Sequence, residues 1–263
     1  MIVLITILGY ALGVFINAAA NSLPFSRRIE RPHCLACGGP RNLIAWSGVS
    51  AWASGNRRCV YCGRGIIFRE LIVELIMIAA AVLLFFFDDP GIHMLRDLIA
   101  VSIFMLIAVI DLEHRLILHM VSVPAALYFA VVGSLDTSLG LSRTALGGLV
   151  GFFFFLLLYI FGGVFARWMG RRRGEEIDEV AFGFGDVMLA LVIGLAVGFP
   201  GVIWALLQGI LLAGVFSFLF MVVMALRKRY EAFTPIPYGP FLILGALLVY
   251  FLGDPYSARF LGL

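Results

Sequence analysis

Two aspartates stand where long apolar segments end or begin, and residues of this type in these places could carry out hydrolysis. Asp111 closes the apolar run 101–110, and Asp186 directly precedes the apolar run 187–199. A carboxylate at membrane depth is costly to bury, so such a residue is a functional candidate. When two carboxyl groups lie close together, one keeps its proton while the other is ionised. The ionised group can take a proton from water while the protonated group polarises a peptide carbonyl, so we predict a catalytic pair.

The second aspartate lies in a motif that glycines flank, Phe182-Gly183-Phe184-Gly185-Asp186. Glycine has no side chain and lets another backbone approach closely, as an extended substrate would need. We therefore assign Gly183 and Gly185 to substrate binding. A simpler alternative stays open at this point, in which each aspartate caps a helix or meets an arginine at the membrane surface.

The four cysteines form two C-x2-C pairs, each followed directly by a glycine. The pairs are Cys34 with Cys37 and Cys59 with Cys62. Four soft ligands at this spacing suit tetrahedral zinc, and a site with four protein ligands leaves no open position for catalysis. The sequence therefore predicts structural zinc that stabilises a short polar segment with little core of its own. The alternative is a redox-active or disulfide-forming pair.

The elements that must position these residues are apolar helices. The chain is 62% hydrophobic and 13% charged, whereas a soluble domain has roughly 45–50% apolar and about 25% charged residues. A membrane-spanning helix takes roughly 20 residues. We predict an all-α polytopic membrane protein with about eight spans: 2–20, 70–87, 94–110, 120–134, 143–163, 184–199, 201–226 and 239–252. The net charge of +3 is too small to indicate nucleic-acid binding.

The positive residues predict the orientation of these spans. All but three of the 19 Lys and Arg residues fall in four loops that share one side of the membrane: 21–69, 111–119, 164–183 and 227–238. Basic loops face the cytoplasm, so the N-terminus is expected outside, with the cysteine loop and both aspartates on the cytoplasmic side. The alternative for the first span is a cleaved signal peptide, but no Lys or Arg precedes its apolar run.

Three parts follow from this organisation. Residues 1–20 form the first transmembrane helix, residues 21–69 the cytoplasmic zinc-binding loop, and residues 70–263 a transmembrane core that carries both aspartates. Glu74 lies slightly inside the second span. It is either a partner of Arg69 on the helix surface or a group of the substrate channel, and we include it among the candidate substrate-binding residues.

Several motifs occur in an order that is similar to the type IV prepilin peptidases, the G-x-G-D class of membrane aspartyl proteases. They are G-V-F-I-N at 13–17, the two C-x2-C pairs, Arg69 with Glu74, Asp111, G-F-G-D at 183–186 and P-Y-G-P-F at 237–241. The resemblance implies an aspartic endopeptidase of the bacterial inner membrane that removes the basic leader of prepilins or pseudopilins. It also implies N-methylation of the new N-terminus with S-adenosylmethionine as donor. Membrane lipids are the remaining expected partners.

The chain departs from the family pattern at two places near the aspartates. Leu118 and His119 stand where the family usually has a Pro-Asp or Pro-Asn pair, and Met188 replaces a lysine. Two alternatives therefore stay open beside the peptidase. One is a weakly active or inactive member that serves as a membrane assembly factor. The other is a proton-coupled transporter. The positions of the acids argue against it, because they gather near the membrane faces rather than along a path across the membrane.

Overall fold

A computed structural model describes residues 1–65, 68–87, 91–173, 183–227 and 237–253. The described residues form helices and isolated bridges but no strand, as the sequence predicts. In chain order the helices are α1 (Ile2–Ser26), the 3-10 helix η1 (Leu43–Trp46), α2 (Gly48–Ala53), α3 (Phe68–Phe87), α4 (Ile92–His114), α5 (His119–Leu135), α6 (Gly140–Arg173), α7 (Phe184–Val197), α8 (Gly201–Leu226) and α9 (Gly239–Leu252).

Each of the eight predicted apolar segments coincides with a helix, because long apolar runs have few alternatives in a bilayer. Within the described ranges, α1, α3, residues 140–165 of α6 and α8 are long and apolar enough to cross a membrane. Helices α5, α7 and α9 are apolar but shorter. The all-α membrane architecture is therefore confirmed, whereas the crossing of all eight helices stays a prediction.

The first helix is longer than its apolar run, which the sequence analysis ended at residue 20. Two serine hydroxyls in the added turns bond to the helix backbone: Ser22 donates to the carbonyl of Ala18 at 2.7 Å, and Ser26 to that of Ser22 at 3.1 Å. The helix ends at Arg27, whose φ of 55° is left-handed. Within the helix both hydroxyls thus find a backbone carbonyl as partner, so these polar residues are compatible with a helix that continues past its apolar segment.

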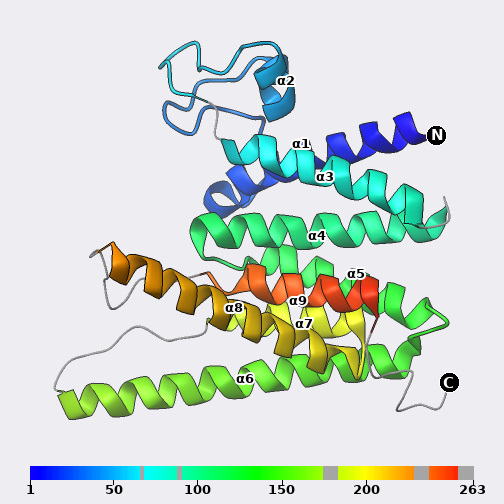
Figure 1. Ribbon diagram of the computed structural model, residues 1–263, viewed down its shortest axis with the longest axis vertical. Helices are drawn as coiled ribbons and strands as arrows, with labels where there is room; N and C mark the ends of the chain where they lie inside the picture. The colour runs from blue at the N-terminus through cyan, green and yellow to red at the C-terminus, as the bar shows by residue number, and fades with distance from the viewer. Residues whose placement is uncertain (66–67, 88–90, 174–182, 228–236, 254–263) are drawn as a thin grey trace. The chain divides into compact units, whose positions relative to one another are not determined.

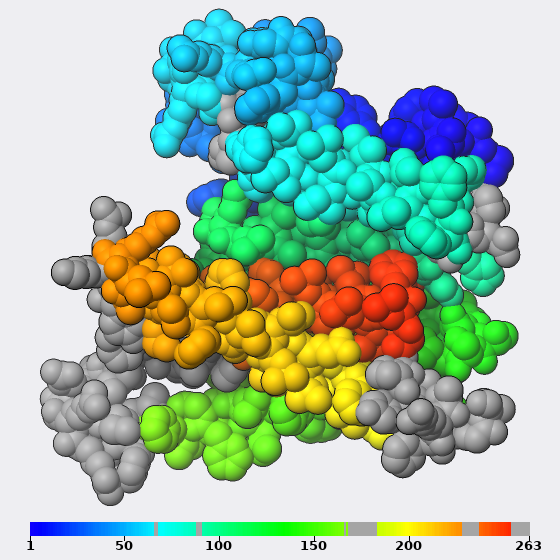
Figure 2. Space-filling model, in the orientation of Figure 1, coloured from blue at the N-terminus to red at the C-terminus, as the bar shows by residue number. Residues whose placement is uncertain are grey.

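Contacts divide the chain into two compact units, Met1–Ile110 and Asp111–Leu263, each described here by itself. In the first unit α1 packs along α3, and Figure 1 shows the two helices side by side. Glycines permit this approach, since a Cβ placed on Gly13 would lie 2.8 Å from the Cα of Glu74. Residues 27–65, which contain the four cysteines, form the cysteine lobe, and Figure 2 shows it as a compact body beside α3.

The second unit contains both aspartates and is built on close contacts between helices. Helix α6 packs along α7, where a Cβ on Gly147 would lie 2.3 Å from the Gly194 carbonyl oxygen. A Cβ on Gly151 would lie equally close to the Ala190 carbonyl oxygen. Small residues spaced four apart let backbones approach in this way. The same contacts fix α7, the helix that begins with the G-x-G-D motif.

Candidate functional site

Asp186 lies in the first turn of α7 and is held by its own motif. The backbone N–H of Gly183 donates to Asp186 Oδ2 at 2.9 Å, and the N–H of Asp186 donates to the Gly183 carbonyl at 3.1 Å. An acid in the first turn also suits the positive end of the helix dipole. Asp186 therefore caps its helix, and this cap holds one oxygen of the carboxylate in a fixed place.

Asp111 lies near the end of α4 and is 5% exposed. Its Oδ2 accepts a hydrogen bond of 3.0 Å from the backbone N–H of Gly239, the first residue of α9. Each of the two aspartates therefore uses Oδ2 to accept a backbone amide.

The turn that follows Asp111 contacts the G-x-G-D motif directly. Arg115 has a left-handed φ of 53°, and its N–H donates to the Asp111 carbonyl at 2.8 Å. This reversal brings Ile117 against the motif, where a Cβ on Gly185 would lie 2.9 Å from the Ile117 Cβ. From the sequence, Gly185 is expected to leave space for the substrate backbone. In the structure Ile117 occupies that space, so the close packing of this turn already accounts for the glycine.

Gly183 differs from Gly185, because it is exposed and the described residues leave space around it. The nearest atoms to a Cβ placed there are Asp186 Oδ2 and Gly185 N, both at 3.8 Å. An extended chain could therefore approach the backbone at Gly183, as the sequence analysis expects for substrate binding.

An aromatic cluster borders the same motif. The His119 ring stacks on Phe184 with centroids 5.6 Å apart and planes 11° from parallel. Tyr159 meets Phe184 edge-on at 6.2 Å. His119 is one of the two residues that stand in place of the usual Pro-Asp pair. Its ring thus supports the residue between the two motif glycines, which sequence position alone did not reveal.

Glu74 has a different environment from either one that the sequence analysis considered. It is fully buried, and its two oxygens accept four hydrogen bonds: from Asn17 Nδ2 at 3.1 Å, Ser47 Oγ at 2.6 Å, Gly48 N at 2.8 Å and Val49 N at 2.9 Å. A carboxylate offers about four lone-pair sites, so no acceptor site is left for a substrate. Glu74 instead caps α2 and joins the cysteine lobe to α3.

A second buried carboxylate strengthens this attachment and was missed from sequence. Glu70 is 1% exposed and pairs with Arg41 Nη1 at 2.7 Å, while Asn21 Nδ2 donates to its other oxygen at 3.0 Å. No local pattern marks Arg41 as its partner, because the two residues are 29 positions apart. The cysteine lobe is thus fastened to α3 by two acids that α3 itself supplies.

The four cysteine sulfurs gather into one cluster, with Sγ atoms all within 4.8 Å of one another. The Sγ atoms of Cys34 and Cys62 are 3.7 Å apart, as are those of Cys37 and Cys59. A Zn–S bond of about 2.3 Å in a tetrahedron places sulfurs about 3.8 Å apart, whereas a disulfide would bring them to about 2.05 Å. The cysteines are free, and their arrangement fits a tetrahedral metal site rather than disulfides.

Both cysteine pairs have the same backbone geometry. The N–H of Cys34 donates to the Gly39 carbonyl and that of Cys59 to the Arg64 carbonyl, each at 2.8 Å. The glycine that follows each pair has a positive φ, 70° at position 38 and 69° at position 63. The amides of Ala36 and Cys37 lower the pKa of the Cys34 thiol to about 6. At Cys34 the turn thus favours the thiolate, which is the form that binds metal.

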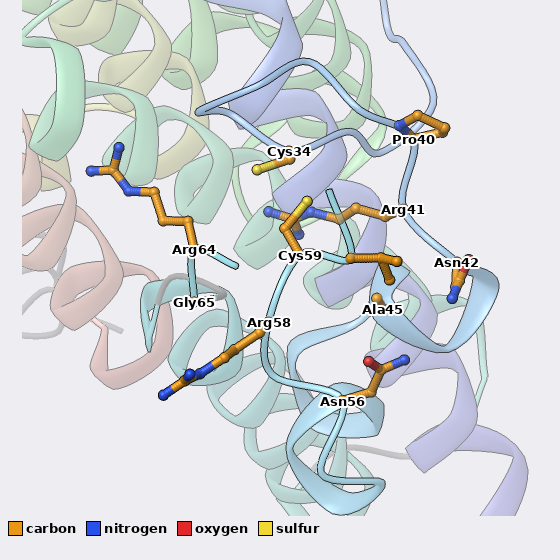
Figure 3. Close-up of a pocket in the computed structure, with 11 residues that line it drawn as sticks. Cys34, Pro40, Arg41, Asn42, Ala45, Asn56, Arg58, Cys59, Arg64 and Gly65 are labelled. Atoms are coloured by element: carbon orange, nitrogen blue, oxygen red, sulfur yellow. The ribbon is translucent and has the colours of Figure 1, made fainter. Parts of the chain in front are cut away.

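An open hollow adjoins the cysteines. It is lined by Cys34, Pro40, Arg41, Asn42, Ala45, Asn56, Arg58, Cys59, Val60, Arg64 and Gly65. In Figure 3 the side chains of Arg58 and Arg64 extend away from Cys59, on the side opposite Asn42. The guanidinium of Arg41, the third arginine of the lining, is paired with Glu70.

Comparison with known proteins places both parts of the chain in one group. The model described as the type IV leader peptidase family matches residues 98–226, which include both aspartates. The model described as the bacterial peptidase A24 N-terminal domain matches residues 7–87, which include the four cysteines. No solved structure matches the chain.

Three relatives share the name prepilin leader peptidase/N-methyltransferase. The protein from Aeromonas salmonicida strain A449 is 22% identical over 90% of this chain and 76% of its own length. The protein from Dichelobacter nodosus is 24% identical over the same shares. The protein from Burkholderia pseudomallei strain 1026b is 27% identical over 90% of this chain and 73% of its own length.

Proposed function

The chain belongs to the type IV leader peptidase family, and we propose that it is an aspartic endopeptidase that removes the leader of type IV prepilins or pseudopilins. The single observation that carries this proposal is that the turn after Asp111 packs against the G-x-G-D motif of Asp186 within one compact unit. The relatives that match 90% of this chain are named prepilin leader peptidase/N-methyltransferase, which supports the proposal. Of the competing functions, neither a transporter nor an assembly factor requires such a pair.

The proposed reaction uses one proton shared between the two carboxyl groups. The ionised group takes a proton from water as the water oxygen attacks the scissile carbonyl carbon, and the protonated group gives its proton to the carbonyl oxygen. The resulting diol then breaks its C–N bond. The first group protonates the leaving nitrogen, and the second takes back a proton from a hydroxyl. The pair returns to its starting state and no covalent intermediate with the enzyme forms.

Backbone amides prepare the two acids for this reaction. Gly183 N–H fixes Oδ2 of Asp186, and Gly239 N–H fixes Oδ2 of Asp111. A carboxylate offers about four lone-pair sites, so each acid keeps acceptor sites for water and substrate. Positioning of this kind lowers the barrier because fewer orientations must be lost during the reaction. The exposed backbone at Gly183 is the proposed place for the substrate chain.

Leader cleavage by purified protein in detergent tests this proposal. We expect wild type to cleave a prepilin leader segment, and Asp111→Asn and Asp186→Asn each to abolish cleavage. Asp97→Asn is the matched control, because Asp97 is also 5% exposed, lies on the same helix and pairs with Arg96 at 2.8 Å. Cleavage that survives both active-site changes would contradict the proposal. An assembly factor would instead lose its cellular function after cysteine substitutions and keep it after aspartate substitutions.

We propose zinc as the metal of the cysteine cluster, in a structural role. Four sulfurs complete a tetrahedron and leave no position for a reacting water. The ion would hold the two turns of the lobe together, while Glu70 and Glu74 fasten the lobe to α3. Metal analysis of purified protein tests this: about one zinc per chain supports the proposal, and metal-free protein with an intact lobe contradicts it.

The proposed setting is the bacterial inner membrane, with eight helices across it and the N-terminus outside. The family and the apolar helices support an inner-membrane protein. The distribution of basic residues supports the orientation, which puts the cysteine lobe and both aspartates at the cytoplasmic face. Reporter fusions in the loops 21–69 and 135–142 would test it, since the two loops are expected on opposite sides.

N-methylation of the new N-terminus, with S-adenosylmethionine as donor, is the proposed second activity. The names of the relatives support it. When bound, the donor would supply the methyl group. Transfer of labelled methyl from S-adenosylmethionine to a cleaved peptide tests the activity, and cleavage without transfer would contradict it.

A further inference from the structure

The start of α9 meets one of the two aspartates at very close range. Gly239 and Asp111 are 128 positions apart, yet the Gly239 N–H donates to Asp111 Oδ2 at 3.0 Å. The first amides of a helix have no partner within that helix. The next residue, Pro240, has no N–H at all. The free amide at this helix start is therefore directed to the carboxylate proposed to react.

The same place leaves no room for a side chain on residue 239. An added Cβ would lie 2.5 Å from Asp111 Oδ2 and 3.1 Å from its Cγ. Any other residue must displace either the carboxylate or the start of α9. Because Asp111 is 5% exposed, the carboxylate has little free space into which it could move.

Close contacts with α8 hold helix α9 in place, so the backbone N–H at the start of α9 has a fixed position. A Cβ on Gly245 would lie 2.3 Å from the Ala205 carbonyl oxygen, and one on Gly209 would lie 2.7 Å from the Leu242 Cα. These contacts lock α9 against α8 along its length. Asp186 takes its amide from a residue three positions away, but Asp111 depends on this separate helix.

We infer that Gly239 is a positioning residue of the aspartate pair, whose N–H and missing side chain together orient the Asp111 carboxylate for reaction. This inference rests on the proposed peptidase function. It gives a role to the glycine of the P-Y-G-P-F motif, a role distinct from those of the two aspartates. Gly239 acts through Asp111 and needs no contact with substrate.

The test compares three glycine-to-alanine variants in the leader-cleavage assay. Gly239→Ala should lower kcat by about 100-fold, since a displacement of about 1 Å in a reacting group can cost that much. KM should stay within about threefold of wild type, because substrate binding does not depend on the orientation of Asp111. Gly214→Ala, where no atom lies within 4 Å, should change neither value.

Gly245→Ala separates positioning from a general shift of α9. It strains the α8–α9 contact but leaves the space beside the Asp111 carboxylate free, so it should lower the Tm and lower kcat much less than Gly239→Ala does. Wild-type kcat in Gly239→Ala would overturn the inference. Equal loss of kcat in Gly245→Ala would also overturn it, because any displacement of α9 would then suffice. Cleavage by Asp111→Asn would instead refute the proposed peptidase function, on which this inference rests.

A second pair of variants tests the contact if Gly239→Ala does not fold. Asp111→Asn keeps an oxygen that can accept the Gly239 N–H, whereas Asp111→Leu has a similar size and no acceptor. Hydrogen exchange at the Gly239 amide should therefore stay slow in the first variant and become fast in the second. Equal exchange rates in the two variants would overturn the inference.

Discussion

Replacing Glu74 by glutamine should loosen the cysteine lobe from α3 while leaving the shape of the side chain unchanged. In the wild type Oε1 accepts from Asn17 and Gly48, and Oε2 accepts from Ser47 and Val49. Glutamine keeps one of these oxygens. In place of Oε2 it can present an NH2 group, from which the Ser47 hydroxyl can accept but the Val49 N–H cannot, so at least one hydrogen bond is lost.

The magnitude follows from the charge and the burial of the group. A hydrogen bond to a charged group contributes about 1.5–3 kcal/mol, so the loss of one costs about that much. Glu74 is 0% exposed, so water does not replace the missing partner. At about 1.4 kcal/mol for each factor of ten, opening of the lobe should become roughly 10- to 100-fold more frequent.

Hydrogen exchange measured by mass spectrometry on the peptide 43–53 reports this opening directly. The amides of Gly48 and Val49 should exchange much faster in Glu74→Gln than in wild type. Glu30→Gln is the matched control in the same unit, because the Glu30 side chain is 50% exposed. Unchanged exchange in Glu74→Gln would refute the role of Glu74 as the cap of α2, and would reopen the substrate-channel role.

Three further predictions concern packing, metal and the aromatic cluster. Gly147→Val should lower the Tm, because the added carbons collide with the Gly194 carbonyl and overpacking costs about 1–3 kcal/mol; a Tm equal to that of wild type would contradict the α6–α7 contact. Cys34→Ser should reduce bound zinc and speed proteolysis of the lobe, and full metal content would argue against the four-sulfur site. His119→Ala should lower cleavage while His119→Phe retains it, because stacking on Phe184 contributes about 0.5–1.5 kcal/mol; equal activity of the two variants would exclude a stacking role.

The sequence predicted best those features that neighbouring residues specify. Each apolar run became a helix, because a long apolar segment can satisfy its backbone only internally in a bilayer. The cysteines were predicted to gather at one site because C-x2-C turns place two sulfurs together whatever surrounds them. Helix ends were less predictable, as the serines that extend α1 show.

The features that sequence did not predict depend on residues far apart in the chain. Glu74 is 57 positions from Asn17 and 26 from Gly48, so no local pattern shows that its acceptor sites are filled. The contact of Gly239 with Asp111 spans 128 positions. Gly185 was expected to make room for substrate, but the turn after Asp111 takes that room. Such pairings are set by helix packing, which a single sequence does not state.

The most direct measurement of the central claim is kcat/KM for leader cleavage in wild type, Asp111→Asn, Asp186→Asn and the double variant. Residues that act as one catalytic unit show strongly non-additive effects. We predict that each single change reduces cleavage to the same background as the double change, while the variants remain folded. If the losses of the two single variants multiply in the double variant, or if either single variant keeps substantial activity, the two aspartates do not act as a pair.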